Sequence, residues 1–288
     1  MKIFVFVALA VALTLPASAQ SANRIYAQEL IDKTLAQHPE VLELSMRVTP
    51  PKSFDSVIIA SNRGQIGQKS DADDLAVINT GDARSNVDVG GKRFESKFAL
   101  QDVSGDTIGA VSVVFPYVTG QDTSALQKSA QSIRDGLRRQ VINSANLMDP
   151  VPYVVNPPLC HYAQKLVDQT IEKHPELLVL VMHVALPNGS DYPIIASSIG
   201  RIGKKADEGD MQVVETGQSI LGAYGAKKTR FGIELAMHDV SGKVLGALST
   251  GFAYKDGDDQ QPLVHSAQQI EAELRKQIPS LTKLCGPS

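Results

Sequence analysis

The sequence of 288 residues has no tryptophan, only two cysteines and no block of basic residues. Without a basic block, nucleic acids and anionic membrane surfaces are not expected partners. After residue 15, no apolar run approaches the roughly 20 residues that a membrane-spanning helix needs. A low-complexity tract is also missing, so the composition predicts a folded protein rather than a disordered one.

The first 19 residues have the pattern of an export signal. Lys2 gives a positive start, residues 3–15 are apolar, and Ala17-Ser18-Ala19 fits a signal peptidase site. We therefore predict a signal peptide over 1–19, with cleavage near Ala19-Gln20. The mature protein is then expected to be periplasmic or secreted, without a membrane span.

The rest of the sequence contains one unit twice. YAQELIDKTLAQHPEVLELSMRV, beginning at Tyr26, returns as YAQKLVDQTIEKHPELLVLVMHV, beginning at Tyr162. The offset is 136 residues at this point and 137 residues later, where Asp102 corresponds to Asp239. A duplication of this length predicts two domains. We place them at 20–142 and 159–288, joined by a Pro- and Asn-rich linker over 143–158.

Both units predict the same order of elements from their hydrophobic periodicity. A glycine-rich connection, GQIGQKSDADD in the first unit and GRIGKKADEGD in the second, precedes the last two strands. The order predicts an α+β fold in which an antiparallel sheet is flanked by N- and C-terminal helices. The elements expected in the first unit are a helix beginning at Tyr26 and ending at His38, strands over 42–48 and 57–60, hairpin strands over 94–101 and 108–115, and a closing helix over 126–141.

This order resembles the extracytoplasmic Cache domains, the PAS-like sensor modules of bacteria that are also called PDC sensors. The resemblance rests on the long leading helix and on the strand–D-x-S-G–strand hairpin, which continues into Ile108-Gly109 or Leu245-Gly246. It implies tandem sensor domains with small-molecule pockets against one face of each sheet, under the loops that follow the early strands. The chain departs from the family because neither a membrane anchor nor an output domain is expected. The aromatic–arginine–aspartate pattern of amino-acid-binding members is also missing, so no ligand class is implied.

Both cysteines belong to the second unit. Cys160 lies just before its first helix and Cys285 just after its last. In an oxidising compartment we expect a disulfide between them. Closing so long a loop stabilises a protein by up to about 4–5 kcal/mol in the chain-entropy model. A redox-active pair is the alternative, although no C-x-x-C motif is present.

The glycine-rich connections are the first candidate for a ligand site. Their glycines allow close backbone approach, and exposed N–H groups beside a lysine could hold an anion or a carboxylate. Alternatively, the glycines shape a tight loop whose lysine and aspartates pair with each other or cap a helix. The spacings of a phosphate loop and of an EF-hand are absent. The candidate ligand-binding residues are Gly200, Arg201, Gly203, Lys205, Asp207 and Asp210 in the second unit and Gly64, Gly67, Lys69 and Asp71 in the first.

Two histidines of the second unit, His183 and His238, are further candidates. Both fall in predicted strands and replace Arg47 and Gln101 of the first unit. If the strands are neighbours, the imidazoles could converge on a metal or a haem edge. If they are not, we expect solvent-facing side chains.

The first strand differs most between the units. Its outer face carries Glu43, Ser45 and Arg47 in the first unit and Val179, Val181 and His183 in the second. A strand that is apolar on both faces needs a cover for its second face. The other repeat, a second subunit or an apolar ligand could provide it.

Three functional hypotheses follow. The leading one is an exported, non-catalytic protein that binds a small molecule of unknown class and presents it to a membrane receptor. The second is an interaction or scaffold module that acts through the outer face of the strand over 177–184. The third, an envelope hydrolase or redox enzyme, has little support because G-x-S-x-G, H-E-x-x-H and a Cys–His pair free of the disulfide are all missing. No cofactor and no resident metal are predicted.

Overall fold

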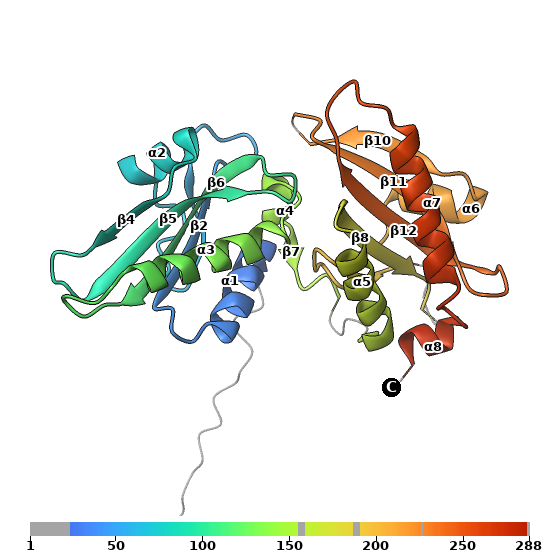
Figure 1. The fold of residues 1–288 in the computed structure, drawn as a ribbon, viewed down its shortest axis with the longest axis horizontal. Coiled ribbons are helices and arrows are strands. Elements are labelled where there is room, and N and C mark those ends of the chain that lie inside the picture. The colour runs from blue at the N-terminus through green and yellow to red at the C-terminus, as the bar shows by residue number, and fades with distance from the viewer. Residues whose placement is uncertain (1–23, 155–158, 187–190, 226, 287–288) are drawn as a thin grey trace, which may run out of the picture.

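The computed structural model describes residues 24–154, 159–186, 191–225 and 227–286, so the predicted signal peptide lies outside the described residues. Figure 1 shows two lobes, each a sheet with its helices, and the lobes correspond to the two repeats. Within the described ranges, no helix combines the length and the apolar composition needed to cross a membrane.

The first repeat is built on a five-stranded antiparallel sheet with the strand order β3-β2-β6-β5-β4. Helices α1 and α3 contribute to the apolar core on one face of this sheet. Helix α2 lies on the opposite face, where its buried Asp74 contacts Arg47 and Lys97. The elements are β1 Arg24–Ile25, α1 Tyr26–Gln37, β2 Glu43–Val48, β3 Val57–Ser61, α2 Ala72–Thr80, β4 Arg84–Val87, β5 Arg93–Gln101, β6 Thr107–Pro116, α3 Ser124–Arg138, α4 Ser144–Leu147 and β7 Pro150–Val151.

The second repeat has a matching five-stranded antiparallel sheet with the strand order β9-β8-β12-β11-β10. Helices α5 and α7 pack on its core face, and α6 takes the place that α2 has in the first repeat. The elements are α5 His161–Lys173, β8 Leu177–Val184, β9 Ile194–Ser197, α6 Glu208–Thr216, β10 Ile220–Tyr224, β11 Arg230–His238, β12 Val244–Ala253, α7 Gln261–Arg275 and α8 Leu281–Cys285.

The leading helices form as their periodicity predicts. Leu30, Ile31 and Thr34 of α1 are buried on one stripe and pack on the sheet. The helix ends at His38 because the residue before a proline avoids the helical region. Equivalent residues of α5 make the same contact in the second repeat.

The sequence prediction of four strands per repeat was incomplete, because each repeat also contains a short helix and a fifth strand. Helices α2 and α6 have nine residues each, and each buries only one aliphatic side chain. Their sequences therefore lack the amphipathic stripe from which a helix is predicted. Strand β4 is exposed along its whole length and lacks the alternation that predicts a strand. The helix ends do carry signals, namely capping boxes at Asp71 and Asp207 and left-handed glycines at Gly81 and Gly217.

The predicted linker over 143–158 is partly folded. Its first half forms α4 and the strand β7, which pairs with β1 in an antiparallel two-stranded sheet. Leu147 and Val151 are buried in the core of the first repeat. Helix α8 occupies the same place in the second repeat and buries Leu284. This segment therefore belongs to the repeated unit, and residues 155–158 lie outside the described residues.

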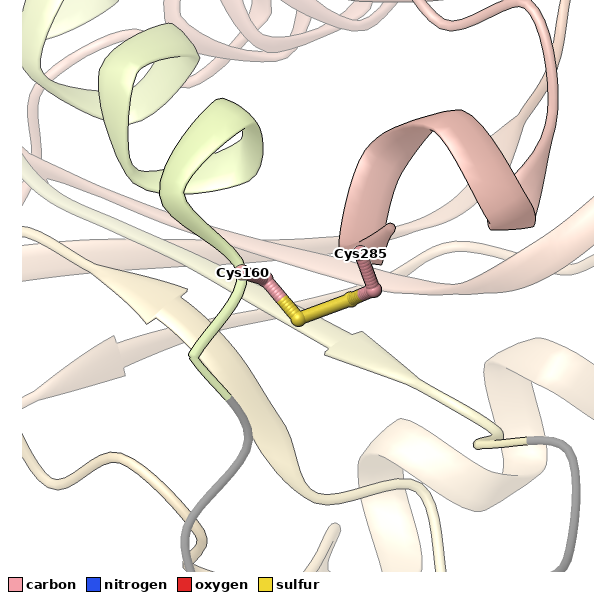
Figure 2. Close-up of a disulfide and its surroundings, with 2 residues drawn as sticks. All are labelled: Cys160 and Cys285. Carbon is pink, nitrogen blue, oxygen red and sulfur yellow. A yellow bond between two sulfur atoms is a disulfide. The ribbon is translucent and has the colours of Figure 1, made fainter. Parts of the chain in front are cut away.

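The predicted disulfide is present between Cys160 and Cys285, with an S–S distance of 2.02 Å (Figure 2). It joins the start of α5 to the end of α8, which are 125 residues apart in the sequence. The bond thus closes the second repeat at its two ends. Both cysteines of the sequence are thus in this disulfide.

The second face of β8 is covered by the first repeat. Val179 and Val181 are buried in a cluster with Val103, and Ile142 packs against the same cluster. Arg230 fixes the edge of this contact by donating hydrogen bonds to the Ser104 hydroxyl, at 3.0 Å, and to the Ile142 carbonyl. The sequence left three possible covers for this face, and in the structure it is the other repeat that covers it.

Candidate functional site

The glycine-rich loop of the second repeat lies at the junction with the first. The Tyr26 hydroxyl donates to the Ile199 carbonyl at 2.7 Å, and a Cβ on Gly200 would come within 2.7 Å of the same hydroxyl oxygen. Arg201 and Lys204 both bind the Asp149 carboxylate, at 3.1 and 2.8 Å. Arg201 therefore helps to hold the two repeats together, and Gly200 leaves the room that the Tyr26 side chain needs.

The other loop residues form local contacts. Lys69 pairs with Asp55 at 2.8 Å and Lys205 with Asp191 at 2.6 Å, and all four side chains are largely exposed. Gly64, Gly67 and Gly203 have positive φ, as the alternative of a tightly shaped loop requires. The loop does not bring its lysine to the carboxylates that follow it.

Those carboxylates lie at the start of the short helices, on the outer face of each sheet. Asp207 accepts hydrogen bonds from the backbone N–H groups of Gly209 and Asp210, and the Asp210 carboxylate accepts one from the N–H of Asp207. Asp71 and Asp74 form the same reciprocal arrangement in the first repeat. A capping box thus fixes both carboxylates of each repeat against the sheet.

In the first repeat, these carboxylates are neutralised by two cations of the sheet. Lys97 Nζ lies 2.6 Å from Asp71 and 3.1 Å from Asp74, and Arg47 Nε lies 2.7 Å from Asp74. The Lys97 side chain is only 8% exposed and that of Asp74 only 1%. Although burial opposes it, the hydrogen bond from Lys97 lowers the pKa of Asp71, and the bond to Asp71 raises the pKa of Lys97. Glu95, two residues before Lys97 on β5, accepts a hydrogen bond from Ser112, and its negative charge also raises the pKa of Lys97. Two cations thus face the carboxylates of the first repeat.

The second repeat reverses the charge of this set. Glu234 takes the position of Lys97, since each pairs with the equivalent serine of the next strand, Ser249 or Ser112. His183 replaces Arg47 and places Nε2 3.3 Å from Asp210, while its Nδ1 lies 3.0 Å from a backbone carbonyl. Histidine is charged only when protonated, so at most one cation faces three carboxylates.

Glu234 is the side chain that this reversal of charge affects most. Its Oε2 atom is buried and has no hydrogen-bond partner among the described residues. Burial, together with the negative charges of Asp210 and Asp207, raises the pKa of Glu234 to about 7. Burial and the same three carboxylates raise the pKa of the neighbouring Tyr224. The site therefore has more negative charge than its own side chains neutralise.

The three carboxylates are close enough to share one cation. One oxygen from each of Asp207, Asp210 and Glu234 lies within 4.8 Å of the others. Oxygen ligands of this kind suit a hard divalent cation such as Mg²⁺, Ca²⁺ or Mn²⁺. They equally suit an ammonium group, which has three N–H donors and no acceptor.

A bare stretch of sheet lies beside the carboxylates. Gly232 pairs with Gly222 on one side and Gly251 on the other, so three neighbouring strands lack side chains there. The Tyr224 ring lies over this stretch, because a Cβ on Gly232 would come within 2.6 Å of a ring carbon. The corresponding residues of the first repeat, Asn86, Glu95 and Val114, all carry side chains.

The structure brings together three of the residues predicted from the sequence, namely Asp207, Asp210 and His183. His238 does not join them, because it pairs with Glu271 of α7 at 2.8 Å and its strand is separated from β8 by β12. The hypothesis that His183 and His238 converge is therefore wrong. Glu234, Ser249 and Tyr224 were missed. The exchange of Lys97 for Glu234 between aligned repeats was the signal that could have found them.

No protein family matches the sequence, and no curated protein matches it. Similar solved structures include the GAF domain of A. aeolicus nlh2, with 9% identity over 39% of this chain and 88% of that chain and a TM-score of 0.30. The cofactor-binding GAF domain of the nutrient sensor CodY from Clostridium difficile has 13% identity over 54% and 97% of the chains, with a TM-score of 0.26. The periplasmic domain of RsbU from Chlamydia trachomatis has 11% identity over 88% and 80%, also with a TM-score of 0.26. At these identities and TM-scores, the likeness carries no argument about ligand or function.

Proposed function

We propose that this protein is an exported, non-catalytic small-molecule-binding protein of tandem Cache type. Its second repeat binds a ligand that presents a positively charged group, an organic ammonium ion, to Asp207, Asp210 and Glu234. The ligand-bound protein is then presented to a membrane receptor. Export is supported by the N-terminal sequence, and the Cache type by the order of elements in each repeat.

The charge reversal between the repeats is the observation that carries this proposal. The first repeat demonstrates the chemistry, because the Lys97 ammonium group already lies between Asp71 and Asp74. In the second repeat, Glu234 stands where the lysine would be, so the corresponding carboxylates have lost the ammonium group and face another carboxylate in its place. A ligand ammonium group placed there would satisfy the buried Glu234 Oε2 atom.

The surroundings of the carboxylates favour an organic ligand over a bare ion. The glycine stretch around Gly232 has no side chains of its own on this face, and the Tyr224 ring covers it. A ligand can occupy this place if the ring moves aside. Tyr224 is 42% exposed, so its ring can move without opening the core. An aromatic face beside a cation site contributes a further attraction to an ammonium ligand.

A divalent metal ion is the second candidate, because the oxygen atoms of three carboxylates suit it. In that case Asp207, Asp210 and Glu234 would supply the ligand atoms. The second repeat would then sense or store the ion itself.

Isothermal titration calorimetry on protein freed of metal with EDTA tests the proposal. Butylammonium and 1,4-diammoniobutane should bind saturably, and butanol, which has no charge, should not. Glu234→Lys, which copies the first repeat, should abolish the binding. Glu215→Lys is the matched control, because it makes the same charge change at an exposed position of α6.

The outcomes separate the candidates. Binding of Mg²⁺, Ca²⁺ or Mn²⁺ with no binding of either amine would favour the metal site. If neither amines nor divalent ions bind, or if both lysine variants weaken binding equally, the proposed site does not exist. Native mass spectrometry of protein purified from the periplasm then identifies the natural ligand, and cell fractionation tests the export.

A further inference from the structure

A hollow of about 460 Å³ lies between the two repeats, and none of the three carboxylates of the proposed site lines it. The first repeat contributes Val103 and the C-terminal part of α3, with Arg138 and Arg139. The second repeat contributes the end of α5 and the start of β8. Its volume is within the range of about 300–1,000 Å³ that is typical of small-molecule sites, which occur preferentially between domains.

The wall from the second repeat is apolar. Leu177 and Leu178 begin β8, and Ile171 lies on the last turn of α5, and all three line the hollow. Val103 faces them from the first repeat. Leu177 and Val103 are already buried, whereas Leu178 and Ile171 are half-buried. An apolar body placed here would cover these two half-buried side chains.

The wall from α3 is positively charged. Arg138 Nε donates to the Asp102 carbonyl at 3.3 Å, so this arginine is held in place. Asp135 also lines the hollow, but its carboxylate pairs with Arg134 at 2.9 Å. Arg139 is exposed, and among the described residues no carboxylate lies within ion-pair distance of its guanidinium group. One cation at the mouth of an apolar hollow is therefore left without a partner.

We propose that this hollow binds an amphipathic monoanion, a carboxylate with a short apolar chain. The carboxylate pairs with Arg139, whose planar guanidinium group matches it in geometry. The chain lies against Leu178 and Ile171. Because such a ligand contacts both repeats, it stabilises their arrangement seen here and couples the hollow to the orientation of the second repeat.

The end of the second repeat supplies a natural control. Lys276 follows Arg275 at the end of α7, as Arg139 follows Arg138 at the end of α3. Arg139 lines a hollow beside Val103, and Lys276 lines another beside the equivalent Val240. The described residues that line this hollow all belong to the second repeat, and Val240 is 52% exposed. The same basic position thus occurs once with an apolar second wall and once without it.

Calorimetric titration with octanoate, below its micelle-forming concentration, tests the proposal. Octanoate should bind saturably, whereas octanol and octylammonium should not. Arg139→Glu should weaken octanoate binding by about tenfold or more. Lys276→Glu should leave it unchanged, and both variants should keep the parent melting temperature, because both side chains are exposed.

A second pair of variants tests the apolar wall. Leu178→Asn should also weaken octanoate binding, whereas Leu42→Asn, at the equivalent and exposed position of the first repeat, should not. The proposal is overturned if octanoate shows no saturable binding or if octanol binds as tightly. It is also overturned if Arg139→Glu and Lys276→Glu weaken binding equally, since that result indicates unspecific attraction to basic surface.

Discussion

The two repeats share one fold but differ in the charge of one internal site. In the first repeat, Arg47 and Lys97 neutralise the two aspartates of the capping box. In the second, His183 and Glu234 stand in their places, and Glu234 is left with a buried oxygen atom that has no partner among the described residues. A buried ion set contributes to stability only when its charges are paired. The first repeat therefore holds its buried aspartates in ion pairs at this site, whereas the second keeps a buried carboxylate oxygen that a ligand can pair with.

The repeats also differ in how the outer face of the first strand is used. Strand β2 presents Glu43, Ser45 and Arg47 there, whereas β8 presents two valines that the first repeat covers. The contact between repeats is thus directional, because the end of the first repeat docks on the face of the second. The polar face of β2 offers no equivalent apolar surface.

Reversing the charge in the first repeat should have the largest effect. Lys97→Glu would add a carboxylate to Asp71, Asp74 and Glu95, with only Arg47 to neutralise them, at a site where the lysine side chain is 8% exposed. Removing one partner of a buried pair costs about 3–5 kcal/mol, so we expect a loss of that size in the free energy of unfolding. Urea denaturation measures it. Lys97→Met, which removes the cation without adding a carboxylate, should lose less, and an equal loss in both would contradict the charge argument.

The second-largest effect is expected from removing the disulfide, which only the second repeat contains. Cys160→Ser with Cys285→Ser opens a loop of 125 residues in the second repeat only. We expect a loss of about 2–4 kcal/mol from the unfolding free energy of the second repeat. Urea denaturation followed by hydrogen exchange of each repeat checks this. The transition of the first repeat should not move, and a shift in both would mean that the repeats unfold as one unit.

The covered face of β8 gives the third contrast. Val181→Asp places a charge in a cluster where the valine is 4% exposed, while Ser45→Asp makes the same change at the equivalent position of β2. A buried polar group without a partner costs about 1–3 kcal/mol, so Val181→Asp should destabilise the chain by that amount. Ser45→Asp should cost less. Small-angle scattering should also show a larger radius of gyration for Val181→Asp alone, and an unchanged radius would contradict the proposed role of this face.

Much of the fold followed from sequence periodicity, because long elements bury whole faces. The stripe of Leu30, Ile31 and Thr34 and the alternation along β2 and β8 predicted the main helices and strands. Helices α2 and α6 were not predicted because they bury little apolar surface. The sequence marks them only by the capping residues at their ends and not by an amphipathic stripe. Local signals of this kind are easily assigned to a loop when glycines precede them.

The site was predictable only in part, because its members come from separate strands. Asp207 and Asp210 were found through their recurrence, and His183 through its exchange for Arg47. Glu234 lies on β11, and its closeness to the aspartates depends on the pairing of β11 with β12 and on the position of α6. Neither is visible in the sequence. The reversal of charge from Lys97 to Glu234 was visible, but only a comparison of differences between the repeats would have revealed it.

The last contrast comes from pH, and it separates the repeats without changing the fold. The folded protein raises the pKa of Glu234 from 4.5 to about 7, so the protonated form is favoured by folding. Its contribution to stability is complete below about pH 4.5 and is lost as the pH rises through 7. In cation-free buffer, the urea midpoint of the second repeat should therefore fall across this window in the parent, and less so in Glu234→Gln. Because a bound cation must replace that proton, amine affinity should rise over the same window. Identical pH profiles for the parent and Glu234→Gln would show that Glu234 does not titrate there.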